Sequence, residues 1–454
     1  MFTLEEKLKI NPLHSSKAAF RPSLLLACIL LGSVLAGCQS MPFFGPSEEP
    51  PVASPTLTKQ VNIEPHNFQL ADGQNIVGSL ATVDTRENDT LPDIARHYGL
   101  GYNDITIANV NIDPWTPQPG SQVLLPLRFI LPEAPHKGIV LNLANMRLFF
   151  YPQKQPDTLF TYPVGIGRQG WNTPMGSTKI ISKRANPAWT VPESIHREHA
   201  QKGDPLPKVV RAGPNNPLGK YAMPLGFSGY LIHGTNKPYG IGMQISHGCV
   251  QLYPEDIEVL FNKSKVGMPV QIVHQPYLTA WDHEMLYLEA HEPLQKWAKQ
   301  KPKLKKKLIN ELKQIGTQQN VSIDFEKVDR ILERADGIPT PILTGSPDIK
   351  ELTTAAVQVD HPDQLYGQPV VEELKESDWA VLAATFDNET EAQQLAAMLS
   401  HQGPPIPARK MEKDGVYQVI AGPFKNKKEV KTVAQRIRMD FELDAKPLKP
   451  GKVN

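Results

Sequence analysis

The chain has 454 residues, of which 40% are hydrophobic and 21% are charged, with a formal net charge of +1. This length is enough for about two to four domains. The near-neutral charge argues against nucleic acid as a partner. The 43 prolines are more than usual, and they cluster between the expected domains.

The amino terminus has the pattern of a secretory signal. Basic residues precede an apolar run over residues 24–34, which is shorter than the roughly 20 apolar residues that span a bilayer. The run ends in Leu35-Ala36-Gly37-Cys38, which resembles the lipobox of bacterial lipoproteins. The resemblance implies a signal peptide over residues 1–37, acylation of Cys38, and a lipid-anchored protein of the periplasm. Gln39 stands where inner-membrane lipoproteins of enterobacteria carry aspartate, which implies the outer membrane; an uncleaved anchor or an ordinary signal is the alternative.

Cysteine usage leaves one free thiol. Cys28 lies in the signal and Cys38 would carry lipid, so Cys249 would be the only free thiol of the mature protein. Structural cysteines in oxidising compartments usually come in pairs, so a single one is either a small buried hydrophobe or a reactive thiol. The chain has neither a Cys-x-x-Cys nor a His-Glu-x-x-His motif, which argues against a closed zinc site. No metal is expected.

A segment rich in proline and polar residues, 38–80, is expected to be a tether. Residues 81–127 then predict a small βααβ unit, with a helix opening at Asp89-Thr90-Leu91 and a last strand from Gln122 to Leu125. Taken in order, with Pro119-Gly120 before that strand, these motifs resemble the LysM module. The resemblance implies binding to N-acetylglucosamine-containing glycans such as peptidoglycan.

Residues 136–274 predict a mostly β domain. Aromatic and β-branched runs bounded by turn residues indicate its strands. The expected strands cover residues 138–143, 147–151, 160–167, 177–182 and 229–232, and a helix covers residues 254–261. The strand at 229–232 delivers a histidine, His233, at its end.

Two histidines flank the free thiol of this domain. Cys249 ends the run Ser246-His247-Gly248-Cys249, sixteen residues after His233. A thiolate is the attacking species, so Cys249 needs a neighbour that lowers its pKa and a base that carries protons. His233 comes from a different strand and can face the sulfur. Gly248 lets the backbone bend, so that consecutive N–H groups can point at a developing oxyanion.

Three segments together resemble the YkuD-type L,D-transpeptidases: residues 214–221, 229–236 and 245–257. The LysM module and the Leu-Tyr-Pro-Glu-Asp-Ile run after the cysteine are similar to the branch that attaches Braun's lipoprotein to peptidoglycan. The resemblance implies attack on the L-centre carbonyl of diaminopimelate in a tetrapeptide stem, with release of D-Ala. A second diaminopimelate or a lipoprotein lysine would then resolve the thioester, without any cofactor.

The same resemblance implies the role of each site residue. Cys249 is the nucleophile, and His233 is the general base and acid, oriented by a backbone carbonyl such as that of Gly234. Ser246 and His247 shape the loop, and the N–H groups of His247, Gly248 and Cys249 form the oxyanion hole. The residues expected to bind substrate are Gln251, Tyr230, Tyr221 and Asn236.

Gln251 departs from the pattern of the family. Close relatives of this branch carry arginine two places after the cysteine, and other branches carry asparagine. A charge-assisted hydrogen bond is about twice as strong as a neutral one. We therefore expect an altered stem-peptide or acceptor preference with the thioester step intact, and a neutral substitution is the alternative.

The remaining chain predicts a helical extension, a linker and a last domain. Residues 275–335 are expected to be a helical extension, with an apolar stripe including Leu308 and Leu312 that packs on a neighbour. Residues 336–376 are expected to be a linker. Residues 377–450 contain two strand–helix repeats, starting at Trp379 and Tyr417, which predict a ferredoxin-like α+β domain. With Ala421-Gly422-Pro423-Phe424, they resemble the SPOR domain, which implies binding to peptidoglycan glycan strands.

The sequence therefore predicts a multidomain protein with a mostly β YkuD catalytic domain between LysM and SPOR-like modules. Peptidoglycan is the expected partner, with an outer-membrane lipoprotein as a further candidate acceptor. A hydrolase of the same fold, an L,D-carboxypeptidase or an amidase, is left open because only the acceptor differs. A non-catalytic wall-binding lipoprotein is the other alternative, which the set His233, Ser246, His247 and Cys249 argues against.

Overall fold

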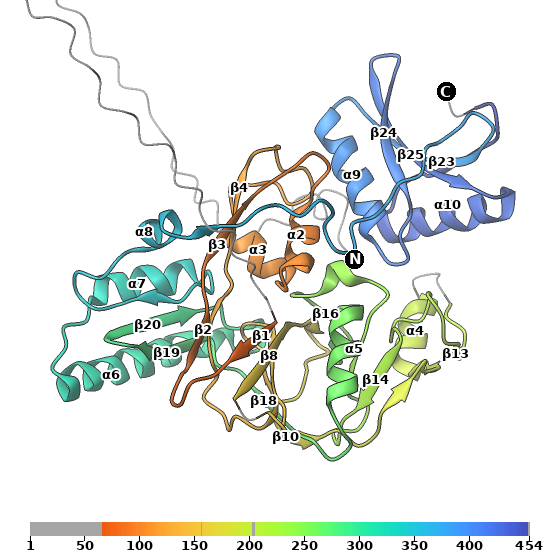
Figure 1. The fold of residues 1–454 in the computed structure, drawn as a ribbon. Helices are drawn as coiled ribbons and strands as arrows, with labels where there is room; N and C mark the ends of the chain where they lie inside the picture. Colours follow the sequence, from red (N-terminus) through yellow and green to blue (C-terminus); the bar gives the residue numbers. More distant parts are fainter. Residues whose placement is uncertain (1–65, 156, 202–204, 453–454) are drawn as a thin grey trace, which may run out of the picture.

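The computed structural model describes residues 66–155, 157–201 and 205–452 (Figure 1). The predicted signal peptide, Cys38 and most of the predicted tether lie outside these ranges. Within the described ranges, none of the helices combines the length and apolar composition that crossing a bilayer requires.

The predicted catalytic domain is built on a six-stranded sheet. Its strands, in sheet order, are β1 (Asn67–Gln69), β8 (Thr158–Pro163), β7 (Arg147–Tyr151), β6 (Gly138–Asn142), β18 (Pro269–Val273) and β10 (Gly176–Lys179). Neighbouring strands are antiparallel except β6 and β18, which are parallel. Alternate residues of β6 face opposite ways: Ile139 and Leu141 enter the catalytic core, and Val140 packs against the core of the LysM module. The sheet is therefore buried on both faces.

A second group of short elements carries the site residues that the sequence predicts. They are β9 (Ile166–Gly167), β11 (Arg184–Ala185), β12 (Trp189–Thr190), α4 (Glu193–Gln201), β13 (Val209–Val210), β14 (Tyr221–Pro224), β15 (Leu231–His233), η1 (Pro238–Gly240), β16 (Gln244–Ser246), β17 (Val250–Gln251) and α5 (Pro254–Lys263). Strands β11-β14-β15-β17 form one sheet, and β16 pairs with β9. Ile232, Val250 and Ile257 join the core of the large sheet, so the small sheet is fixed against it. The predicted helix after Tyr253 begins at Pro254 as expected, because proline fits the first turn.

The LysM module has the predicted βααβ order. Its elements are β3 (Ala81–Asp84), α2 (Leu91–His97), α3 (Tyr102–Ala108) and β4 (Gln122–Leu125). The Thr90 side chain accepts from the N–H of Asp93, so Thr90 is the N-cap that the sequence predicts. The predicted strand from Gln122 to Leu125 is confirmed.

The predicted tether ends earlier than residue 80. Strand β1 pairs with β8 of the catalytic sheet, with Phe68 opposite Leu159. Strand β2 (Ile76–Gly78) pairs with β5 (Arg128–Ile130), and Val77 is buried. Residues 67–78 are therefore part of the folded protein, because their apolar side chains are covered by two modules.

The extension after the catalytic domain is not wholly helical. A hairpin of β19 (Tyr277–Asp282) and β20 (Met285–Ala290) comes first, and η2 (Gln295–Gln300), α6 (Lys301–Gln319) and α7 (Phe325–Arg334) follow. Leu308 and Leu312 are buried against the hairpin, which confirms the predicted packing of the leucine stripe. This hairpin is not predicted from the sequence, because half-exposed positions such as Tyr277, Trp281 and Tyr287 are also aromatic and mask the alternation.

The predicted linker over 336–376 also contains regular structure. It holds β21 (Thr340–Pro341), α8 (Ile349–Thr354) and β22 (Val357–Gln358). Strand β21 pairs with β20, and β22 pairs in parallel with β3 of the LysM module. This segment therefore connects the extension and the LysM module through strand pairing with both.

The carboxy-terminal domain has the predicted ferredoxin-like pattern. Its elements are β23 (Trp379–Phe386), α9 (Glu389–His401), β24 (Ala408–Lys413), β25 (Val416–Phe424), α10 (Lys427–Phe441) and β26 (Lys446–Leu448). The sheet order is β24-β25-β23-β26, with both helices packed in one core (Figure 1). Trp115 of the LysM module packs against this core, and His401 at the end of α9 forms an ion pair of 2.7 Å with Asp93 of α2.

Candidate active site

Parallel pairing brings the predicted nucleophile and base together. Strand β15 lies beside β17, with Ile232 opposite Val250 and His233 opposite Gln251. Cys249 immediately precedes β17, and its Sγ lies 3.8 Å from the carbonyl oxygen of Gly229. The residues that the sequence separates by sixteen positions therefore lie at one edge of the small sheet.

Ser246 closes the catalytic loop. Its hydroxyl donates to the carbonyl of Cys249 at 2.6 Å and accepts from the N–H of Gly248 at 3.1 Å. Both bonds hold the four-residue loop in one conformation. The Gly248 N–H therefore faces Ser246, which leaves the N–H groups of His247 and Cys249 as the remaining members of the expected oxyanion hole.

Gly248 is required by both conformation and space. Its φ of +102° lies in the region that favours glycine. A Cβ there would lie 2.7 Å from Cε1 of Tyr230, a contact that real side chains do not make. The Tyr230 ring thus covers the loop, and this predicted substrate-binding residue lies at the site.

The His233 ring is held in one tautomer. Nδ1 lies 2.6 Å from the carbonyl oxygen of Gly234, which can only accept, so Nδ1 carries the proton and Nε2 is the basic nitrogen. His233 is buried, and this burial lowers its pKa to about 4. The ring is therefore neutral at pH 7.

The Cys249 thiol is neutral as well. Burial raises the pKa of Cys249 to about 11, although a hydrogen bond from the backbone at Leu231 acts in the opposite direction. The bond at Leu231 acts in the direction that the sequence requires of a neighbour, but desolvation outweighs it. Without a preformed thiolate, the sulfur must lose its proton as it attacks.

His247 is held by residues that the sequence does not single out. Arg168, just after β9, donates to both carboxylate oxygens of Glu198 on α4 at 2.6 Å, and its Nη2 lies 2.9 Å from Nε2 of His247. Nε2 of His247 also lies 3.2 Å from Oε2 of Glu198, so the ring is held between a guanidinium and a carboxylate. Burial, the largest cause, lowers the pKa of His247. Trp171 packs edge-on against the same ring at 5.0 Å.

Thr173 is a second residue that the sequence leaves unmarked. Its hydroxyl accepts from the Gly167 N–H at 3.0 Å and donates to the Gly248 carbonyl at 2.9 Å. Strand β9 and the catalytic loop are thus joined through one side chain. A lone threonine after a Trp-Asn pair carries no signal that could have marked it.

Three predicted substrate-binding residues have other contacts. The Tyr221 hydroxyl donates to Glu258 at 3.0 Å. Asn236 lies against the SPOR-like domain, since a Cβ on Gly403 would overlap its carbonyl oxygen. Gln251 is half-buried beside Gly165, with its Oε1 buried and without a hydrogen-bond partner. Of the three, Gln251 stands opposite His233 in the register of β15 and β17.

No metal cluster is found in the described ranges: no three His, Cys, Asp or Glu side chains are placed there to share an ion. The chemistry that the site offers is proton transfer and nucleophilic attack. An imidazole on β15, a thiol directly before the neighbouring strand β17 and backbone donors are the parts of an acyl-transfer site.

Comparison with known proteins gives the family of this site. Residues 136–272 match the L,D-transpeptidase catalytic domain model, residues 85–126 the LysM domain and residues 375–444 the SPOR domain. The chain is 41% identical over 227 residues to "Probable L,D-transpeptidase YbiS" of Escherichia coli K12, which covers 49% of this chain and 74% of that protein. The chain belongs to the L,D-transpeptidase family.

Two further relatives agree with this L,D-transpeptidase assignment. "Probable L,D-transpeptidase ErfK/SrfK" of Escherichia coli K12 is 37% identical over 281 residues, covering 61% of this chain and 90% of that protein. "Probable L,D-transpeptidase YcfS" of the same organism is 36% identical over 263 residues, covering 56% and 82%. The protein is thus a cysteine-dependent acyltransferase of the cell envelope whose LysM and SPOR domains bind peptidoglycan.

Proposed function

We propose that Cys249 attacks the L-centre carbonyl of diaminopimelate in a tetrapeptide stem and releases D-Ala. The observation that carries this proposal is the pairing of β15 with β17, which sets His233 beside the Cys249 loop. Nδ1 of His233 is occupied by the Gly234 carbonyl, so Nε2 is the nitrogen left to take the thiol proton. The same nitrogen then gives that proton to the leaving D-Ala amine.

Neutral resting groups favour a coupled proton transfer. With pKa values of about 4 for His233 and about 11 for Cys249, an imidazolium–thiolate pair is unfavourable before substrate binds. Attack and deprotonation therefore occur together, and the developing oxyanion is stabilised by the N–H groups of His247 and Cys249. The ring of His247, fixed by Arg168, keeps its own N–H in place.

An amine is the proposed acceptor of the acyl group. A second diaminopimelate would give a cross-link, and a lysine of an outer-membrane lipoprotein would give an attached protein. Gln251 lies next to His233 with an unpartnered, buried Oε1, so it is placed to receive a donor group of stem peptide or acceptor. Gln251→Arg adds a charge at this position, and we expect it to change the ratio of the two products.

A lipid anchor at Cys38 would hold the enzyme at the outer membrane. Cys38 lies 28 positions before His66, the first described residue. An extended chain covers at most ~3.6 Å per residue, so the folded part would stay within about 100 Å of the membrane. Radiolabelled palmitate incorporation that Cys38→Ala abolishes would support the anchor, and unchanged incorporation would refute it.

The decisive experiment follows the products by mass. The soluble form, residues 39–454, is incubated with disaccharide-tetrapeptide muropeptides beside its Cys249→Ala variant. Loss of D-Ala with a cross-linked dimer, absent in the variant, supports transpeptidation. Loss of D-Ala with only tripeptide product favours a hydrolase or a missing acceptor, and no reaction favours a non-catalytic wall-binding role.

A further inference from the structure

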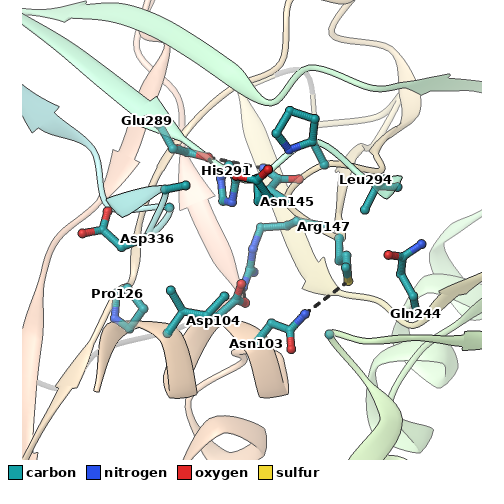
Figure 2. Close-up of a pocket in the computed structure, with 18 of the residues that line it drawn as sticks. Asn103, Asp104, Pro126, Asn145, Arg147, Gln244, Glu289, His291, Leu294 and Asp336 are labelled. Atoms are coloured by element: carbon teal, nitrogen blue, oxygen red, sulfur yellow. Dashed lines mark hydrogen bonds and ion pairs between the residues drawn. The ribbon is translucent and has the colours of Figure 1, made fainter. Parts of the chain in front are cut away.

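A cavity of about 510 Å³ lies where the LysM module, the catalytic sheet and the extension meet. Asn103 and Asp104 of α3 form one wall, and Glu289 and His291 at the end of β20 form the opposite one (Figure 2). Gln244 of β16 closes a third side. The cavity exists only because the three parts pack together, and it is not lined by Cys249 or His233.

Asn145 is an unpartnered polar side chain in this cavity. It is 5% exposed and lies in the turn before β7, and its Oδ1 is buried without a hydrogen-bond partner. Its Nδ2 is 3.4 Å from a carboxylate oxygen of Glu289. If Oδ1 and Nδ2 of Asn145 were exchanged, an amide oxygen would face the Glu289 carboxylate and repel it. The atom without a partner is therefore the acceptor Oδ1. A buried acceptor without a donor is unfavourable, and a bound donor would remove that cost.

The charged groups around Asn145 are already matched. Arg147 is paired with Asp104 at 2.9 Å, and Glu289 accepts from His291 at 2.7 Å and from a backbone N–H at 2.7 Å. No cation of this wall is left for an anionic ligand, whereas the Asn145 oxygen still needs a donor. An anionic ligand is therefore disfavoured, and the ligand must carry O–H or N–H donors.

We propose that this cavity binds an N-acetylhexosamine unit of a glycan strand. Hydroxyl and acetamide groups supply donors for Asn145, and Met146, Leu294 and Ala298 give apolar surface for a sugar face and an acetyl methyl. The volume lies in the range of small-ligand sites. Asn103 and Asp104 come from a module that binds peptidoglycan, so that polymer is the source of the sugar. This proposal rests on the proposed function in one respect: both take peptidoglycan as the polymer that the enzyme binds.

The cavity adjoins the strand that leads to the catalytic loop. Gln244 lies two residues before Ser246, and its Nε2 contacts the Gly167 carbonyl at 3.4 Å. Gly167 is joined through Thr173 to the Gly248 carbonyl. A sugar seated against Gln244 would therefore fix a glycan strand at a constant position relative to Cys249.

The test is calorimetric titration of the full-length protein with triacetylchitotriose, a neutral N-acetylglucosamine trimer. Ala298 is exposed at the rim, so Ala298→Trp should block the cavity without removing a hydrogen bond. Ala71→Trp places the same ring at an exposed alanine elsewhere and is the matched control. Asn145→Leu keeps the approximate shape and removes the acceptor. We expect one binding site to weaken at least tenfold in Ala298→Trp and Asn145→Leu, and none to change in Ala71→Trp.

A stability readout separates a ligand role of Asn145 from a structural one. If its oxygen serves a ligand, the urea midpoint of Asn145→Leu stays level or rises, because an unpaired buried acceptor is lost. The proposal is overturned if either cavity variant binds like the wild type, or if that midpoint falls. Cys249-dependent release of D-Ala, measured on the same preparations, reports on the proposed function separately. If the cavity variants bind the trimer like the wild type and still release D-Ala normally, only the glycan site is refuted.

Discussion

Replacing Arg147 should cost this protein more stability than any exposed charge change. The side chain is 1% exposed, and its guanidinium donates to the Gly99 carbonyl at 3.2 and 3.3 Å and to Asp104 at 2.9 Å. It also lies 4.0 Å from the ring centroid of Phe129. Gly99 and Asp104 belong to the LysM module, whereas Arg147 begins β7 of the catalytic sheet. One side chain therefore joins two domains.

The size of the effect follows from what Arg147→Met leaves behind. Methionine keeps the apolar stem, but the Asp104 carboxylate and the Gly99 carbonyl lose their donor. Breaking a buried ion pair from one side costs about 3–5 kcal/mol. The Asp104 side chain is 19% exposed, so water can compensate part of its charge. We expect a loss of about 3 kcal/mol in the free energy of unfolding, near the lower end of that range.

Urea unfolding followed by tryptophan fluorescence measures this loss. Arg197→Met, at an exposed position of α4, is the matched control and should change stability by less than about 0.5 kcal/mol. Asp104→Asn in the Arg147→Met background should add little, because the unpaired charge is then gone. A loss under about 1 kcal/mol for Arg147→Met would refute the reasoning, as would full additivity of the two changes.

Three further outcomes are expected. With pKa values of about 4 for His233 and about 11 for Cys249, alkylation of the thiol by iodoacetamide should be slow at pH 7 and rise with pH, and a rate plateau below pH 8 would contradict this. Gly248→Ala should lower D-Ala release at least about 100-fold with unchanged far-UV circular dichroism, because its Cβ displaces the catalytic loop. Burial alone would lower the pKa of His401, but the Asp93 charge outweighs it and the pKa is raised. The pair should therefore stabilise SPOR docking below about pH 6.5 and lose this effect as pH rises through the raised pKa. Proteolysis of the 355–378 segment should be faster at pH 9 than at pH 5.5 in the wild type, with no such difference in His401→Gln.

The sequence predicts the three modules because each has a local pattern. The Thr90 cap, the strand from Gln122 to Leu125 and the two strand–helix repeats of the last domain are set by neighbouring residues. Such signals survive without tertiary information. The YkuD motifs likewise mark His233, on β15, and Cys249, which immediately precedes the neighbouring strand β17.

The short strands escape prediction for a physical reason. Strand β22 has two residues and β1 has three, too few for a periodic pattern to stand out. Both lie in segments whose polar and proline-rich composition indicates a linker. Their pairing with β3 and β8 depends on edges that exist only after the modules have folded.

The same reason applies to the residues around His247. Arg168 and Glu198 are thirty positions apart and come from a strand end and an isolated helix. In the sequence, each looks like an ordinary surface charge. Only the fold brings both side chains into contact with His247. The pKa values of Cys249 and His233 were also beyond the sequence, because burial decides them and burial is a tertiary property.

Single polar pairs decide how the modules act together. Arg96 of α2 makes a bidentate contact with Glu255 of α5 at 2.8 and 2.9 Å, beside the Arg147 and His401 contacts. A LysM module on a flexible linker would raise the local glycan concentration only to about the millimolar range. A LysM module packed on the catalytic sheet instead holds its glycan at one distance and angle from Cys249. Under the proposed function, this rigid packing would select which stem peptide of the bound glycan reaches the thiol.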